Sequence, residues 1–140
     1  MCLRRRLALA LLLVFAPLAH AVDGARQYLK KPAGWFATED AKRVAGNVLS
    51  YQSDLGGWPK NVDTTAAQYA GDRKELKPTF DNGATTDELR FLAQMFDATH
   101  EAKYEEAFGK GYDYILKAQY PTGGWPQYYP PPELSQAHHF

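Results

Sequence analysis

The tetrapeptide Gly56-Gly57-Trp58-Pro59 returns as Gly123-Gly124-Trp125-Pro126, and this repetition decides the fold. Each copy follows two aliphatic residues and a glutamine, and every matching residue of the second copy has a number 67 higher. The matching pairs before the glycines are Val48 with Ile115, Leu49 with Leu116, and Gln52 with Gln119. A constant offset over a helix end, a glutamine and a loop indicates two copies of one helix-then-loop unit. The simpler alternative is a common helix-stop sequence, with Gly just past the helix and Pro beyond it.

Three segments have apolar residues at the three- and four-residue spacing of amphipathic helices. The first runs roughly from Phe36 to Asp54. The second begins at a capping box made by Thr85 and Glu88, and a turn at Asp97 to Glu101 follows it. The third runs from about Ala102 to Gln119, so the second and third are expected to form an antiparallel hairpin. The sequence therefore predicts an all-α fold, part of an α/α toroid (barrel) built of helix-hairpin repeats with long functional loops.

The N-terminal stretch has the pattern of an export signal. Arg4 to Arg6 are positive, Leu7 to Ala16 are apolar, and Ala19-His20-Ala21 places small residues at a cleavage site. The apolar run is far shorter than the ~20 residues that span a bilayer as a helix. We therefore expect residues 1–21 to be a signal peptide and residues 22–140 to form the mature chain. The protein would be secreted or periplasmic, with no membrane association after cleavage.

Charge and cysteine content exclude several classes of protein. Three of the 16 Lys and Arg residues lie in the leader, which leaves 13 against 16 acidic residues in the mature chain. A mildly acidic protein has no electrostatic footprint for nucleic acid. The sole cysteine, Cys2, lies in the leader, so the mature chain has neither a disulfide nor a zinc site of the cysteine type. The aromatic content of 14% would suit carbohydrate contacts, although such residues more often belong to a core.

The long segment between the first two helices carries the polar residues of interest. In the first loop, Trp58 offers a flat ring and Lys60 a cation, which together could hold a sugar carboxylate. Alternatively, Trp58 packs in the core and Lys60 is solvated. Farther along, Asp81-Asn82-Gly83 is a turn sequence that leads into the second helix. Its carboxylate and amide oxygens are ligands that Ca²⁺ prefers, although the residues could equally serve only the turn.

Three stretches resemble the family-ten pectate lyases: GGWPKN at 56–61, TFDNGATTDELRFLA at 79–93 and GGWPQYYP at 123–130. The resemblance covers roughly residues 35–140, and its most specific part is Asp81 to Thr86. It implies an extracellular enzyme with an α/α-toroid-like domain. Such an enzyme would cleave polygalacturonate (pectate) by Ca²⁺-dependent β-elimination, as a monomer when complete.

The resemblance also assigns roles to individual positions. It makes Asp81 the functional aspartate, both a catalytic residue and a Ca²⁺ ligand. The substrate-binding positions that it implies are Trp58, Lys60, Asn61, Asn82 and Trp125. It further implies an arginine base that removes the proton at C5 of the sugar. None of Arg26, Arg43, Arg73 and Arg90 lies in a matching motif, so this base is expected beyond Phe140, with the chain being the N-terminal portion of a catalytic domain truncated at its C-terminus.

Two alternatives belong to other classes of function. One is a non-catalytic pectin- or carbohydrate-binding remnant that keeps the aromatic residues and Asp81. The other is an α/α-toroid enzyme of the terpene cyclase type, since Gln-x-x-x-Gly-Gly-Trp also resembles the repeats of those proteins. The sequence lacks the DxDD and DDxxD acid clusters of that class, and an export signal is unusual for it.

Overall fold

The computed structural model describes residues 23–131. Residues 1–22 and 132–140, which include the expected signal peptide and its cleavage site, lie outside the described residues. The elements in chain order are the 3₁₀ helices η1 (Gly24–Tyr28) and η2 (Ala33–Ala37), helix α1 (Glu39–Ser50), the 3₁₀ helices η3 (Arg73–Glu75) and η4 (Asp81–Gly83), and helices α2 (Thr86–Thr99) and α3 (Ala102–Ala118). Within this range the backbone pairs only at isolated bridges, so the all-α prediction is confirmed. Closure into a toroid stays a prediction.

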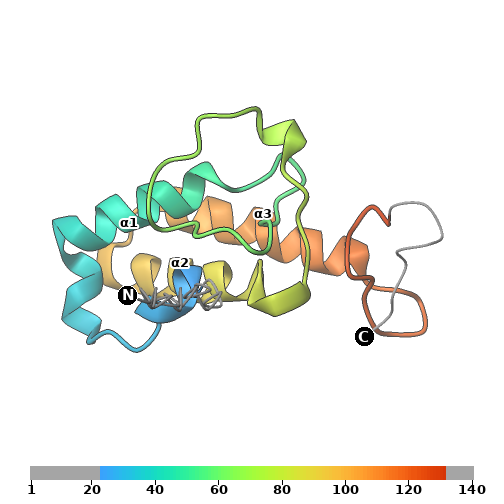
Figure 1. Cartoon of the computed structure of the whole chain (residues 1–140). Helices are drawn as coiled ribbons and strands as arrows, with labels where there is room; N and C mark the ends of the chain where they lie inside the picture. The colour runs from blue at the N-terminus through green and yellow to red at the C-terminus, as the bar shows by residue number, and fades with distance from the viewer. Residues whose placement is uncertain (1–22, 132–140) are drawn as a thin grey trace, which may run out of the picture.

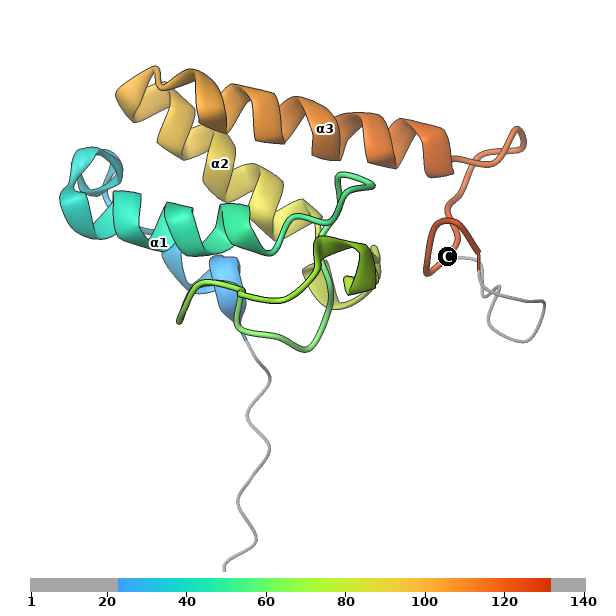
Figure 2. The same cartoon turned by 90° about the horizontal axis from the view of Figure 1, so that it is seen from above.

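The three α-helices alternate in direction, and α2 contacts both of the others. Figure 2 shows α2 crossing between α1 and α3, with α3 running back along α2 as a hairpin. The C-terminal ends of α1 and α3 and the N-terminal end of α2 therefore point to one end of the bundle (Figure 1). The long segment between α1 and α2 and the segment after α3 both start from this end, which we call the loop end.

Helix α1 is shorter than the predicted range of 36–54, and its N-terminal end is fixed by a side-chain cap. The Thr38 hydroxyl accepts a hydrogen bond from the backbone N–H of Ala41 at 3.2 Å, which makes Thr38 the N-cap. Phe36 belongs to the preceding 3₁₀ helix and packs into the core. The apolar face of α1 is fully buried, as its spacing predicted, and includes Ala41, Val44, Ala45 and Val48.

The capping box predicted at the start of α2 is wrong. Thr85 has φ 68° and ψ −48°, far from the extended backbone that an N-cap hydroxyl requires. Its hydroxyl instead accepts from the Trp58 backbone N–H at 2.9 Å and donates to the Thr79 carbonyl at 2.9 Å. Glu88 turns into the interior and accepts from the Thr64 hydroxyl at 3.0 Å. Tertiary contacts with the long loop therefore engage both side chains, and of the expected box only the contact of the Glu88 carboxyl with the Thr85 backbone N–H remains.

The predicted hairpin of the second and third helices is confirmed, with a tighter turn than expected. Helix α2 continues to Thr99, and His100 takes the left-handed conformation with φ 54°. Its backbone N–H donates to the Phe96 carbonyl at 2.8 Å, which closes the helix. The third helix matches its predicted range within one residue. Among the described residues, no helix has the length and apolar character needed to cross a bilayer.

The internal repeat is confirmed at the level of single hydrogen bonds. The Trp58 indole N–H donates to the Val48 carbonyl at 2.8 Å, and the Trp125 indole N–H donates to the Ile115 carbonyl at 2.9 Å. The backbone bonds of the loops match in the same way, since Ser53 N donates to Gly57 O at 2.9 Å and Tyr120 N donates to Gly124 O at 3.1 Å. Each copy thus folds its tryptophan back under the end of its own helix.

Candidate functional site

The segment that leads to Asp81 lies between the two repeat loops. The Thr79 backbone N–H donates to the Trp58 carbonyl at 3.0 Å, on the first loop. On the second loop, the Gln127 carbonyl accepts from the Phe80 backbone N–H at 3.2 Å and from the Thr79 hydroxyl at 2.5 Å. Loops that are 67 residues apart in sequence therefore hold one strand-like segment in common and fix the position of Asp81.

The Asp81 carboxylate accepts from one side chain of each repeat loop. Its Oδ2 atom forms an ion pair with Lys60 Nζ and accepts from Gln127 Nε2 at 2.7 Å. Lys60 and Gln127 are themselves equivalent positions, because their numbers differ by the repeat offset. Lys60 Nζ also lies 5.4 Å from the centre of the Tyr128 ring, within range of a cation–π interaction. We call Lys60, Asp81, Gln127 and Tyr128 the Asp81 cluster.

The ion pair determines the charge state of Asp81. The hydrogen bond from Lys60 lowers the pKa of the Asp81 carboxyl most, the bond from Gln127 adds to this, and partial burial opposes both. The same hydrogen bond raises the pKa of Lys60. Asp81 is therefore a carboxylate at neutral pH and a weak proton acceptor, because a base with a low pKa has little affinity for a proton. It is suited to holding a charge in place and poorly suited to abstracting a proton.

Replacing either donor should bring the pKa of Asp81 back toward its ordinary value. We expect a larger rise in Lys60→Met than in Gln127→Leu, because the Lys60 hydrogen bond is the dominant cause of the shift. An NMR titration of the Asp81 side-chain carboxyl in both variants measures the two shifts. Gln119→Leu serves as the control, since Gln119 is exposed and lies outside the cluster. An Asp81 pKa that is the same in all the proteins would contradict the effect assigned to Lys60 and Gln127.

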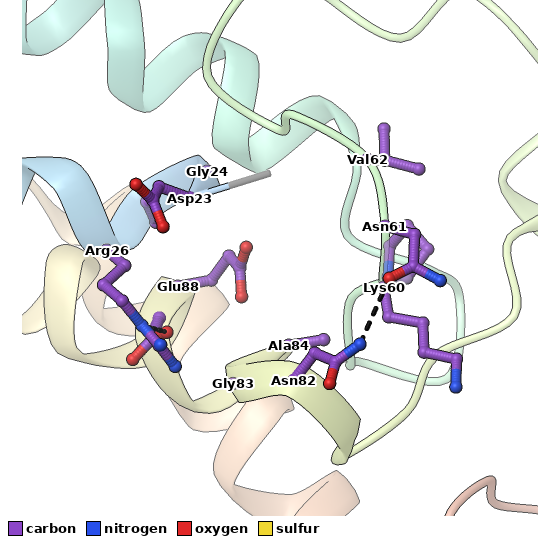
Figure 3. Close-up of a pocket in the computed structure, with 13 residues that line it drawn as sticks. Asp23, Gly24, Arg26, Lys60, Asn61, Val62, Asn82, Gly83, Ala84 and Glu88 are labelled. Atoms are coloured by element: carbon purple, nitrogen blue, oxygen red, sulfur yellow. Dashed lines mark hydrogen bonds and ion pairs between the residues drawn. The ribbon is translucent and has the colours of Figure 1, made fainter. Parts of the chain in front are cut away.

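Asn61 and Asn82 lie beside the Asp81 cluster in unusual backbone conformations. Both are in the left-handed region, with φ 60° and φ 57°, which asparagine tolerates better than most residues. Asn82 Nδ2 donates to Asn61 Oδ1 at 3.2 Å (Figure 3), and both side chains are exposed. The pair retains free amide groups toward solvent, so both residues could bind a substrate, as the resemblance implied.

The structure corrects the role expected for Trp58. Its side chain is fully buried, with 0% exposure, so it offers no ring face for a sugar to stack on. Its indole supports the helix end, as the alternative of a core tryptophan anticipated. The equivalent Trp125 is only half-buried, so its substrate-binding role stays a prediction.

The described arginines form ion pairs or hydrogen bonds with residues other than Asp81. Arg26 and Arg90 both pair with Asp87, at 2.8 Å and 3.2 Å. Arg43 pairs with Asp40 on α1, and Arg73 donates to the backbone carbonyls of Leu49 and Ser50. None of these four arginines is therefore placed as a base next to Asp81, which agrees with their lack of a matching motif.

A cavity of about 250 Å³ adjoins the Asn61–Asn82 pair. Figure 3 shows Glu88 projecting from α2 among the residues that line it, with Arg26 on the η1 side. The Arg26–Asp87 ion pair forms part of this lining, and Gly83 packs directly against it. Gly83 has φ 81°, a conformation that other residues rarely adopt, and a Cβ there would lie 2.3 Å from both Arg26 Nη2 and Asp87 Oδ2, so glycine is favoured at this point.

The residues around Asp81 do not by themselves complete a calcium site. Calcium takes six to eight oxygen ligands, usually with several carboxylates. Over residues 23–131, no group of three or more His, Cys, Asp or Glu side chains could hold a metal ion. Asp81 is the single carboxylate of its cluster, and one of its oxygens is already engaged by Lys60 and Gln127. The described residues therefore do not fit a calcium ion held by this part of the chain alone.

The sequence missed two members of the cluster, Gln127 and Tyr128. The repeat contains the signal for Gln127, because adding the offset to Lys60 leads directly to it. No comparable signal exists for Tyr128, whose equivalent in the first copy is Asn61. The contact of Tyr128 with Lys60 depends on how the two loops meet across the Thr79 segment.

Fold and site together define an all-α protein of helix-and-loop repeats with a charged polar cluster where the loops of two repeats meet. Residues 52–139 match the family described as "Pectic acid lyase", and the chain belongs to this family. No curated protein matches the chain.

The chain is also similar to solved structures of a family 10 polysaccharide lyase from Cellvibrio cellulosa. One is 36% identical with a TM-score of 0.62, over 81% of this chain and 34% of that one. Another is a mutant of that enzyme in complex with trigalacturonic acid, 37% identical with a TM-score of 0.57, over 79% of this chain and 34% of that one. The chain thus spans about a third of the length of these relatives. The matches favour the pectate lyase hypothesis over a toroid of the terpene cyclase type.

Proposed function

We propose that the chain takes part in the cleavage of polygalacturonate by β-elimination and supplies the Asp81 wall of the substrate site. The observation that carries this proposal is the clamping of Asp81 by Lys60 and Gln127 from two equivalent loops, in a chain of the pectic acid lyase family. A similar lyase has been solved with trigalacturonic acid bound, which supports a galacturonate substrate.

The chemistry of elimination explains what this wall would contribute. The C5 proton of a uronate becomes easier to remove when positive charge neutralises the neighbouring carboxylate and stabilises the enolate-like intermediate. Lys60 supplies a cation at the cluster, and the amides of Asn61 and Asn82 supply hydrogen bonds that orient a sugar. Asp81 holds the Lys60 ammonium group in place by their ion pair. The proton acceptor is proposed to be an arginine outside the described residues.

Calcium dependence and export are finer parts of the proposal, and both rest on the family. Calcium would supply further positive charge beside the substrate carboxylate, and Asp81 with the amide oxygen of Asn82 would provide only some of its ligands. The remaining ligands would come from the substrate or from residues outside 23–131. A secreted or periplasmic location is proposed because the polysaccharide is extracellular and the N-terminal pattern is that of an export signal.

A second candidate function is binding of pectate without cleavage. The observation that favours it is the engagement of all four arginines of residues 23–131 in other contacts, so that none of them is placed as a base at the Asp81 cluster. In this case, the chain would bind the polysaccharide through the same residues but would not produce an unsaturated sugar.

Incubation with polygalacturonate and calcium separates the two functions, provided that the protein used is long enough to include the proposed arginine base. For the lyase, we expect the ultraviolet absorbance of the unsaturated product to rise, and the chain to be retarded on a polygalacturonate affinity gel. Asp81→Ala should abolish the absorbance rise and weaken calcium-dependent retardation about tenfold, the equivalent of roughly one charged hydrogen bond. Asp54→Ala is the matched control, because Asp54 is exposed and lies in a turn outside the cluster.

Each outcome of this experiment decides between the hypotheses. Retardation without an absorbance rise would overturn the lyase and favour pectate binding. The absence of both would overturn both functions. If Asp81→Ala and Asp54→Ala give the same absorbance rise and the same retardation, the proposed function stands but the site lies elsewhere.

A further inference from the structure

A second hollow lies next to the Asp81 cluster and shares one residue with it. This groove has a volume of about 390 Å³, and its lining includes Leu55, Lys74, Lys77, Pro78, Tyr128 and Tyr129. Tyr128 belongs to both, since its ring lines the groove and lies 5.4 Å from Lys60 Nζ. A ligand in the groove would therefore be continuous with one at the Asp81 cluster. We call this hollow the lysine–tyrosine groove.

Both charged side chains that line the groove are lysines. Lys74 and Lys77 are exposed, and neither forms an ion pair with any residue between 23 and 131. Two cations free of acidic partners along one groove give it a positive potential in a chain that carries more acidic than basic residues after its leader. The groove therefore favours an anionic ligand.

The walls of the groove are held rigidly by a buried tyrosine of α3. The Tyr114 side chain is 1% exposed, and its hydroxyl lies 3.0 Å from the Pro78 carbonyl and 3.1 Å from the Tyr129 carbonyl. It also accepts from the Tyr129 backbone N–H at 3.3 Å. The Tyr129 ring packs edge-on against the Tyr114 ring, with centroids 5.9 Å apart. One hydroxyl thus joins the Pro78 wall to the Tyr129 wall, and a preformed groove lowers the entropic cost of binding.

The remaining surface suits the face of a sugar ring. Tyr128 and Tyr129 are half-buried, and Leu55 is 49% exposed, so the groove combines flat aromatic and apolar surface with hydroxyl groups. Tyrosine presents an apolar body and a polar tip, which matches the alternating C–H and O–H groups of a pyranose. Lysine ammonium groups act as point charges for carboxylates. The ligand that uses all of these features is a chain of acidic sugars.

We propose that the lysine–tyrosine groove binds uronate residues of the polysaccharide that lie beyond the Asp81 cluster, and so acts as an accessory site for longer chains. This inference rests on the proposed function, because it extends the same substrate along the surface. Lys77 precedes Asp81 by four residues, so at ~3.3 Å per extended residue their Cα atoms lie at most roughly 13 Å apart. A chain of several sugar rings can therefore contact both sites at once.

The double variant Lys74→Ser/Lys77→Ser tests the groove. We expect its affinity for long polygalacturonate to fall about tenfold, since two partly exposed ion pairs contribute about 0–1 kcal/mol each. Its affinity for digalacturonate should be unchanged, because we expect the Asp81 cluster alone to bind this short ligand. The matched control is Lys30→Ser/Lys117→Ser, which removes the same charge from exposed lysines that line neither site. Affinities are measured by titration calorimetry on the full chain, with circular dichroism to verify folding.

The outcomes separate failure of the groove from failure of the function. If the wild-type chain binds neither short nor long galacturonate, the proposed function fails. If the wild type binds both and the groove variant matches the lysine control on the long ligand, the groove proposal is overturned. Polyglutamate is the last comparison: equal affinity of the wild type for polyglutamate and polygalacturonate would show that the groove recognises charge alone, and would overturn its assignment to sugars.

Discussion

Trp58→Ala is expected to remove a large part of the folding free energy of the described region. Trp58 is the largest fully buried side chain, and its surroundings are tight: a Cβ on Gly111 of α3 would come within 3.0 Å of its Cζ3 atom. Truncating a buried tryptophan costs about 3–5 kcal/mol through lost apolar burial and the cavity that remains. The variant also leaves the Val48 carbonyl without its indole donor. Domains are typically stable by only about 5–15 kcal/mol, so a loss of this size is severe.

The internal repeat provides a matched control for this substitution. Trp125→Ala removes the same side chain and the same type of hydrogen bond, here to the Ile115 carbonyl, from a half-buried position. Its cost should be smaller, about 1–2 kcal/mol, because less apolar surface is exposed by the change. Thermal unfolding followed by circular dichroism gives both values. If Trp58→Ala does not fold, Trp58→Phe, for which we expect an intermediate loss of stability, can be compared with Trp125→Ala instead. Equal destabilisation by the two alanine variants would contradict the packing described for the two loops.

Periodic patterns in the sequence predicted the helices well because those patterns record burial. The stripe of Ala41, Val44, Ala45 and Val48 is the buried face of α1, and the third helix matched its predicted range within one residue. The constant offset between the two Gly-Gly-Trp-Pro loops also survived in the structure as matching hydrogen bonds. Local spacing suffices in these cases, since each helix buries the face that its own sequence defines.

Local patterns failed where a distant residue competes for the same group. The capping box at Thr85 was wrong because its hydroxyl bonds to Trp58 and Thr79, which nothing in the neighbouring sequence reveals. The sequence allowed Trp58 to be either a platform for a sugar or a core residue. The packing of α3 against its loop shows that it is a core residue. Such contacts depend on tertiary packing and have no period.

The candidate site shows the same division. Asp81 was predictable from its turn motif and its resemblance to a known family, whereas its charge partners required the meeting of two loops. The lysine–tyrosine groove was not foreseen at all. Its lysines come from an aperiodic loop and its tyrosines from the segment after α3, so no window of sequence contains both.

The stability of the chain should fall as the pH rises from about 4.5 to about 7, because of Glu88. This residue lines the cavity in Figure 3, and one of its carboxyl oxygens, Oε2, has no hydrogen-bond partner among the described residues. Burial raises the pKa of Glu88 from 4.5 to about 7, and the nearby charge of Asp87 adds to the rise. The Thr64 hydroxyl and the backbone N–H groups of Thr85 and Glu88 oppose it.

The direction of the effect follows from where the proton binds more tightly. Between the two pKa values the folded state keeps the Glu88 proton while the unfolded state releases it, so deprotonation favours unfolding. The stabilising contribution is complete below about pH 4.5 and is lost by about pH 7. A shift of this size corresponds to roughly 3 kcal/mol. The lowered pKa of Asp81 acts in the opposite sense and at more acidic pH, so the two windows do not coincide.

Glu88→Gln should therefore abolish this pH dependence and make the chain more stable than wild type at pH 8. The amide has nearly the same shape and can still accept from Thr64, but it never carries a charge in the interior. Chemical unfolding at pH 5 and pH 8 gives the two free energies for each protein. Glu106→Gln is the control, because Glu106 is exposed on α3 and the same substitution there should leave the wild-type slope intact. A Glu88→Gln variant that loses stability between pH 5 and pH 8 as steeply as wild type would place the titrating group elsewhere.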